Sequence, residues 1–98
     1  MLGSSYIIAF AAATDLGRAR AFYEQALGLP LVGQNEIACV FDANGTMLRV
    51  TAVPEVPRAG YAVLGWRVAD IAATARDLAA RGVVFLRYDG MDQDGDGV

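Results

Sequence analysis

The stretch Asp15-Leu-Gly-Arg-Ala-Arg-Ala-Phe-Tyr-Glu-Gln-Ala-Leu-Gly28 decides the fold, because it predicts one amphipathic helix that needs a sheet to cover. Apolar residues recur in it at three- and four-residue spacing, which places them on one face: Ala19, Phe22, Tyr23, Ala26 and Leu27. Asp15 can cap the first turn through its carboxylate, and Gly28 suits the left-handed residue that ends a helix. We therefore expect a helix over 15–28, anchored to the core by Phe22 and Tyr23.

The segments on either side of this helix predict strands. Residues 5–13 form a β-prone apolar run before it, and residues 31–35, 36–42 and 46–53 form three more after it. An Asn-Gly pair, Asn44-Gly45, separates the last two runs and favours a two-residue type I′ hairpin turn, since both residues tolerate positive φ. The order is strand, helix and three strands.

The same order begins again after a linker rich in proline, residues 54–60. A strand is predicted over 61–68, a helix over 70–81 with Ile71, Thr74, Ala75 and Leu78 inward, and a strand over 83–88. Asp70 takes the place that Asp15 has in the first unit, so the chain contains an internal repeat. The second unit has no counterpart of the Asn-Gly hairpin.

We therefore predict an α+β fold in which tandem βαβββ modules form a cupped mixed sheet, with the second module truncated. The chain of 98 residues is expected to be a single domain, 1–98, with module one at 1–53, the linker at 54–60 and an incomplete module two at 61–98.

Composition excludes several classes of function. The chain is 55% hydrophobic and has a net charge of −3 with no basic stripe, so we expect neither nucleic acid nor a membrane as a partner. No run approaches the ~20 apolar residues of a membrane span. One cysteine, Cys39, rules out an internal disulfide and fits a reducing compartment, so a cytoplasmic location is expected.

The helix pattern Asp-Leu-x-Arg-Ala-x-x-Phe-Tyr-x-x-x-Leu-Gly-Leu over 15–29, the Asn-Gly hairpin and the repeated strand-to-Asp order resemble the vicinal oxygen chelate superfamily. That superfamily includes glyoxalases, bleomycin and fosfomycin resistance proteins and extradiol dioxygenases. The resemblance implies paired modules whose sheet curves around a cleft, often across a dimer.

The family's enzymes hold a divalent metal with His and Glu side chains, and the resemblance places Ile8 and Val63 at the two histidine positions. The acidic position on the strand after the hairpin falls at or next to Arg49. The chain contains no histidine, and Ile, Val and Arg side chains do not ligate a cation. We expect no metal of the family's kind and no cofactor.

Strand alternation from Ile8 predicts which other residues face the cleft. The candidate ligand-binding residues are Tyr6, Ile8, Phe10, Met47, Arg49, Thr51, Tyr61, Val63 and Arg67. Such a cleft is apolar with two arginines, whose guanidinium groups could pair with a carboxylate. The same arginines are also compatible with solvent-exposed or dimer-interface positions.

The function that these residues favour is metal-free binding of a small molecule, for example one that carries a carboxylate, in the cleft of a homodimer. One alternative is an enzyme of the same superfamily, a lyase, isomerase or dioxygenase-like protein, for which no catalytic residue can be named. Another is a structural dimerisation module with a filled cleft.

Cys39 is expected to be a buried residue, because no histidine can activate it. Asp92, Asp94 and Asp96 resemble the start of a calcium loop, although a solvated acidic turn explains them better.

Overall fold

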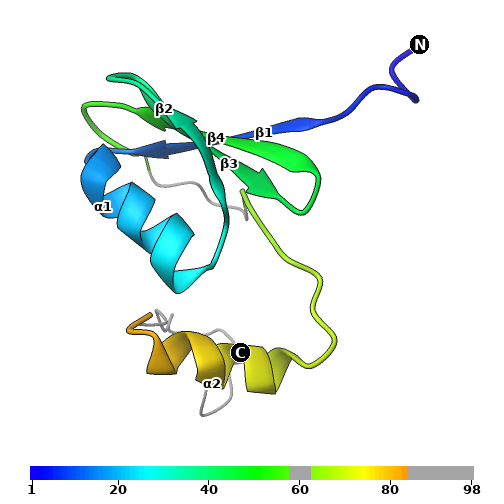
Figure 1. Ribbon diagram of the computed structural model, residues 1–98, viewed down its shortest axis with the longest axis vertical. Coiled ribbons are helices and arrows are strands. Elements are labelled where there is room, and N and C mark those ends of the chain that lie inside the picture. Colours follow the sequence, from blue (N-terminus) through cyan, green and yellow to red (C-terminus); the bar gives the residue numbers. More distant parts are fainter. Residues whose placement is uncertain (58–62, 84–98) are drawn as a thin grey trace. The chain divides into compact units, whose positions relative to one another are not determined.

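A computed structural model of the protein describes residues 1–57 and 63–83, which fall into two compact units, Met1–Leu64 and Gly65–Val98. The expectation of a single domain over 1–98 stays a prediction. The first unit contains four strands and a helix of two parts, in the order predicted from the sequence (Figure 1). Its elements are β1 (Ile8–Ala13), α1 (Leu16–Arg20), η1 (Ala21–Ala26), β2 (Leu31–Gln34), β3 (Ala38–Ala43) and β4 (Thr46–Ala52).

The four strands form one mixed sheet in the order β1-β4-β3-β2. β1 runs parallel to β4, while β4 and β3, and β3 and β2, are antiparallel. The connection between the parallel strands β1 and β4 is long and includes the helix. The antiparallel neighbours β2 and β3, and β3 and β4, are joined by short turns. This arrangement confirms the α+β class and the strand-helix-three-strand order of the first module.

The Asn-Gly hairpin between β3 and β4 is confirmed. Asn44 has a φ of 52° and Gly45 a φ of 93°, the left-handed values that a type I′ turn requires at both central residues. The Asp42 carboxylate accepts a hydrogen bond of 2.7 Å from the Gly45 amide. Ala43 pairs with Thr46 across the turn, so the register of the whole hairpin follows from this one loop.

The helix begins as predicted, because the Asp15 carboxylate accepts from the Arg18 amide at 3.1 Å. It does not keep α-helical geometry. From Ala21 to Ala26 it is a π-helix, in which the Leu27 amide donates to the Phe22 carbonyl at 3.0 Å. The wider turn rotates the side chains that follow Ala19.

This rotation makes the prediction for Phe22 wrong. Phe22 is 42% exposed, while its neighbour Tyr23 packs against the core with its ring 5.4 Å from that of Phe41. An α-helical count from the sequence places both rings inward, whereas a turn closed by i→i+5 bonds holds more residues and brings only Tyr23 inward.

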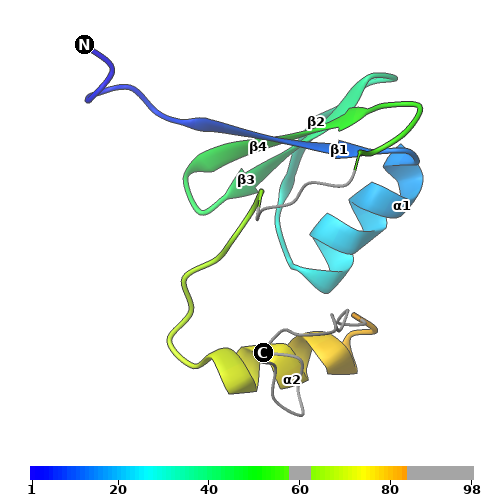
Figure 2. The same cartoon turned by 180° about the vertical axis from the view of Figure 1, so that it is seen from behind.

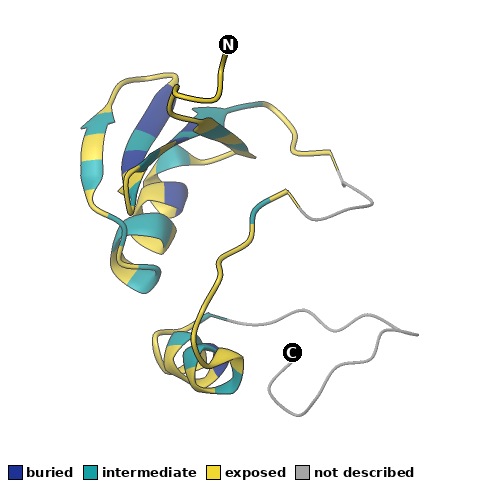
Figure 3. Cartoon of the chain, turned by 90° about the vertical axis from the view of Figure 1, so that its right-hand side faces the viewer, coloured by how far each residue is buried: buried dark blue, intermediate teal, exposed yellow. Residues whose placement is uncertain are grey.

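The core of this unit lies between the sheet and the helix. Its fully buried side chains are Cys39, Phe41, Leu48 and Val50, and Ala19 of α1 packs against them from the helix side. Figure 3 colours buried positions dark blue, and they occur on both the strands and the helix of this unit. β1 contributes the small side chains Ala9, Ala11 and Ala13, which are partly buried against this cluster. The helix therefore covers one face of the sheet, and the two views agree on this (Figure 1 and Figure 2).

The second unit contains α2 (Ile71–Ala80). The Asp70 carboxylate accepts from the Ala73 amide at 3.0 Å, and Gly82 has a φ of 90°, so both predicted helix ends are confirmed. Ala75 is buried, but Ile71, predicted to point inward, is exposed.

The strand predicted over 61–68 is not formed at residues 63–68, while Tyr61 and Ala62 lie outside the described residues. A strand needs hydrogen bonds from a partner segment, and a β-prone run does not supply them by itself. The predicted strand over 83–88 falls outside the described residues beyond Val83.

Candidate functional site

The sheet surface opposite the helix carries most of the candidate residues that the first unit contains, and we call this surface the open face. β1 and β4 are in register, so that Ile8 pairs with Met47, Phe10 with Arg49 and Ala12 with Thr51. Paired residues on neighbouring strands point to the same side of a sheet, and alternate residues along each strand share a face. Ile8, Phe10 and Met47 are exposed there, with Phe10 64% exposed.

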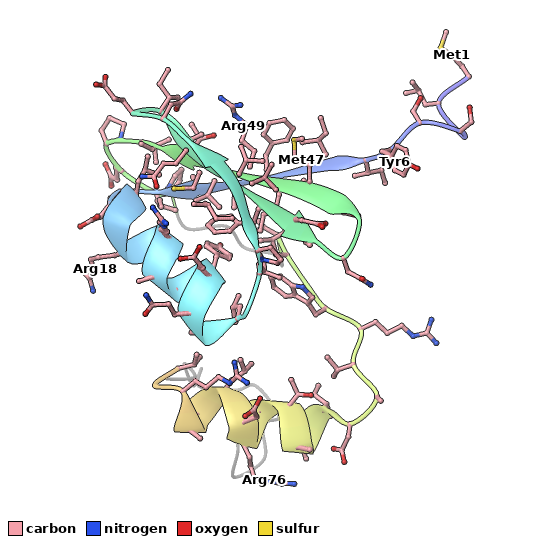
Figure 4. All side chains as sticks on the ribbon, in the orientation of Figure 1. Met1, Tyr6, Arg18, Met47, Arg49 and Arg76 are labelled. Atoms are coloured by element: carbon pink, nitrogen blue, oxygen red, sulfur yellow. The ribbon has the colours of Figure 1, made fainter. Side chains whose placement is uncertain are left out.

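Arg49 lies at the centre of the open face. It has Phe10 beside it on β1 and Val40 beside it on β3. Its side chain points away from α1, as that of Met47 does (Figure 4). Within residues 1–57 and 63–83, no hydrogen bond or ion pair joins Arg49 to an acceptor. Arg49 therefore lies among apolar side chains and forms no ion pair in this part of the chain.

The acidic residue of the open face that lies in register with these positions is Asp42, opposite Met47. Its carboxylate accepts the bond from Gly45 that closes the hairpin turn. Asp42 therefore stabilises the turn, and it forms no ion pair with Arg49.

The remaining candidate residues are placed differently. Tyr6 precedes β1 and is 90% exposed, and Val63 is exposed at a bend of the first unit. Tyr61 lies outside the described residues. Arg67 belongs to the second unit. The assignment of these residues to a ligand site stays a prediction.

The residues at the expected metal positions do not fit a metal ion. Ile8 and Arg49 both lie on the open face, where an aliphatic and a cationic side chain offer no lone pair to a cation. Among the described residues, no three His, Cys, Asp or Glu side chains lie close enough to hold an ion.

Two grooves lie on the helix side of the first unit. One, of about 750 Å³, is lined by Leu16, Arg20, Gln34, Asn35 and Glu36. In it Arg20 donates to Gln34 Oε1 at 3.2 Å and lies 3.5 Å from the Glu24 carboxylate. The Glu24 carboxylate is therefore held in an ion pair with Arg20.

The other groove, of about 390 Å³, runs along the helix between β1 and the segment after β4. Phe22 and Val56 line it, as do Ala13, Ala19 and Tyr23. The outward rotation of Phe22 in the π-helix is what supplies its aromatic wall.

Two side chains near the core have shifted acidities. Burial raises the pKa of the Tyr23 hydroxyl. Burial also raises the pKa of the Cys39 thiol, against a smaller opposite effect from the positive charge of Arg20. Cys39 is buried, with its Sγ 3.9 Å from the Leu16 carbonyl, so the predicted role as a buried residue is confirmed. A protonated, buried thiol is a poor nucleophile.

Sequence reasoning missed Val40, which completes the apolar surroundings of Arg49. The signal was present in the hairpin. Counting back from the two-residue turn at Asn44 and Gly45 places Val40 opposite Arg49, as the structure does. The exposed position of Phe22 had no such signal, because the sequence does not distinguish a π-helical turn from an α-helical one.

No helix among the described residues is both long enough and apolar enough to span a membrane.

Comparison with known proteins agrees with this architecture. The model of the glyoxalase/bleomycin resistance protein/dioxygenase superfamily matches residues 7–94. Among solved structures, the chain is similar to a bleomycin resistance determinant encoded on the transposon Tn5, with 19% identity and a TM-score of 0.64. That match covers 90% of this chain and 72% of the other, and at this identity it shows the fold alone. No curated protein sequence matches the chain.

Proposed function

Because this chain belongs to the glyoxalase/bleomycin resistance protein/dioxygenase superfamily, we propose that it binds a small molecule on the open face of its sheet, without a metal ion. The observation that supports this most is the composition of that face. Exposed Ile8, Phe10 and Met47 surround one cation, Arg49. A mostly apolar surface with a few polar groups is the usual lining of a small-molecule site.

The metal-free part of the proposal rests on the donor set. Neither Ile8 nor Arg49 can ligate a cation, and the whole chain lacks histidine. Metal analysis of purified protein checks this part. One equivalent of zinc, nickel, iron or manganese per chain, lost when Arg49 or Thr51 is replaced, contradicts it.

The proposal also includes a homodimer whose two chains close a cleft over their open faces. A flat, exposed sheet surface buries little of a ligand, whereas two facing surfaces can enclose it. A two-fold contact is the commonest symmetry of such assemblies. Light scattering at micromolar concentration measures the mass in solution, and a monodisperse species of 10.4 kDa, the mass of one chain, overturns the shared cleft.

A thermal-shift screen of small apolar and amphiphilic compounds tests the binding function. We expect at least one compound to raise the melting temperature of the wild type and to lose this effect in Phe10→Ser. Val32→Ser is the matched control, because Val32 on β2 is as exposed as Phe10, at 64%. A ligand that stabilises Phe10→Ser as well as it stabilises the wild type places the site elsewhere.

The two alternative functions predict different results. In a dimerisation module, the open faces pack against each other, so the screen yields no ligand although light scattering shows a dimer. An enzyme needs a base near the ligand, and in the part of the chain described by the structure the carboxylate nearest in register, Asp42, is engaged in the hairpin turn. The observed contacts therefore favour binding without turnover.

A further inference from the structure

We infer that the open face selects aromatic monocarboxylates and rejects cationic ligands of the same shape, with Arg49 holding the carboxylate and Phe10 contacting the ring. This inference rests on the proposed binding function and adds to it the chemical class of the ligand. It follows from the neighbours of Arg49, from the absence of an ion-pair partner in the described residues, and from the geometry of the sheet.

The position of Arg49 on the sheet strengthens the electrostatic interaction of its side chain with a charged ligand. β4 is an interior strand, so apolar side chains flank Arg49 on both sides, Phe10 on β1 and Val40 on β3. Arg49 is partly buried, whereas Phe10 and Met47 beside it are more exposed. A charge beside low-dielectric surface interacts more strongly with a ligand than one surrounded by water.

The charge is not neutralised by a neighbour. In residues 1–57 and 63–83, Arg49 has no ion-pair partner, while Arg20 and Arg81 are each paired with a carboxylate at 3.5 Å. Asp42 is committed to the Gly45 amide. Arg49 is therefore a cation of the open face without an ion-pair partner among the described residues, while Asp42, opposite Met47, keeps its own negative charge beside the turn. Arg49 attracts an anion that approaches it and repels a cation.

The arrangement also favours a particular shape. Phe10 and Arg49 are in register on adjacent strands, which lie about 4.8 Å apart. A carboxylate held by both arms of the guanidinium group leaves the atoms next to it over the Phe10 side chain. A flat ring attached directly or through one carbon fits this spacing, and ring-to-ring contact with Phe10 adds to the apolar contact with Met47.

Three probes that share a phenyl ring and differ in charge test the preference: benzoate, benzyl alcohol and benzylamine, titrated by NMR at neutral pH and low salt into the full chain. We expect benzoate to bind at least about ten-fold more tightly than benzyl alcohol, since a hydrogen-bonded charge pair contributes more than a neutral contact. We expect benzylamine to bind more weakly than both. Shifted resonances should include those of Phe10, Met47 and Arg49.

Variants assign the effect to Arg49. Arg49→Met keeps most of the apolar stem of the side chain and removes the guanidinium group, so benzoate should lose about ten-fold in affinity while benzyl alcohol changes less than about two-fold. Arg49→Lys keeps the charge but not the two-armed geometry of the guanidinium group. Its affinity for benzoate should therefore lie between those of the wild type and Arg49→Met. Arg18→Met is the control, because Arg18 is an exposed arginine on α1 and should leave the preference unchanged.

The outcomes separate this inference from the function on which it rests. If benzyl alcohol or benzylamine binds as tightly as benzoate, small-molecule binding stands and the selection for carboxylates is refuted. If the preference persists in Arg49→Met, the carboxylate is held elsewhere and the inference is equally refuted. If none of the three probes binds the wild type while the compound screen finds a ligand, the aromatic class is wrong. If the screen finds none either, the binding function itself fails.

Discussion

Phe22 and Phe41 offer the sharpest test of the fold, because the same substitution at each should have very different costs. Phe41 lies in the interior of β3 with no exposed surface, and its ring contacts that of Tyr23 at 5.4 Å between centroids. Truncating such a residue removes its apolar burial and leaves a cavity. Phe41→Ala should therefore lower the free energy of unfolding by about 3–5 kcal/mol.

The cost at Phe22 follows from its exposure of 42% and from one aromatic contact. Full burial of a large apolar side chain contributes about 1.5–3 kcal/mol, of which Phe22 realises a little over half. Its edge-to-face contact with Tyr23, at 5.2 Å and 82°, adds about 0.5 kcal/mol or somewhat more. No closed cavity forms at an exposed site, so Phe22→Ala should cost about 1–2 kcal/mol.

Urea denaturation followed by far-UV circular dichroism gives both values. Equal losses in the free energy of unfolding for the two variants refute the outward rotation of Phe22. They indicate a regular α-helix in which both rings point inward. If the stability of this protein lies at the lower end of the roughly 5–15 kcal/mol of a typical domain, Phe41→Ala leaves too little for a reliable measurement. In that case Phe41→Leu, which leaves a smaller cavity, supplies the measurable comparison with Phe22→Ala.

Three further predictions concern local features. Burial raises the pKa of Tyr23 in the folded state above its unfolded value of about 10, so the folded protein binds that proton more tightly and stability falls as pH rises through this range. Denaturation at a series of alkaline pH values should show a smaller fall for Tyr23→Phe, and an equal fall in both proteins contradicts the burial of this hydroxyl. Gly45→Ala places a side chain at a φ of 93° and should cost about 1–2 kcal/mol in the same denaturation assay; a neutral result argues against the type I′ turn. Asp15→Ala and Asp70→Ala each remove a cap and should cost about 0.5–2 kcal/mol, whereas the isosteric Asn variants, which can still accept the amide bond, should cost less.

Local chemistry explains the features that the sequence predicted correctly. Asp15 and Asp70 each accept from an amide three residues ahead, a bond that the side chain forms within its own turn. Asn44 and Gly45 likewise determine a turn through their own φ preferences, and that turn then sets the register of β3 and β4. The absence of histidine excludes the family's metal ligands without any structure.

The side chains around the candidate site were only partly predictable. Alternation along β1 and β4 placed Ile8, Phe10, Met47 and Arg49 on one face, which the strand register confirms. The sequence did not predict that Arg49 has no ion-pair partner among the described residues. It contains Asp42 on the neighbouring strand, and only the structure shows that the Asp42 carboxylate accepts from the Gly45 amide in the turn.

Tertiary structure alone decided which ring of the Phe22-Tyr23 pair enters the core and whether residues 63–68 form a strand. An i→i+5 bond satisfies the backbone as an i→i+4 bond does, so local sequence does not choose between them, and the packing of Tyr23 on Phe41 accompanies the wider turn. A strand, in turn, draws its hydrogen bonds from a different segment of chain. Capping and turn formation are local interactions, whereas helix phase and strand pairing depend on contacts between residues far apart in the sequence.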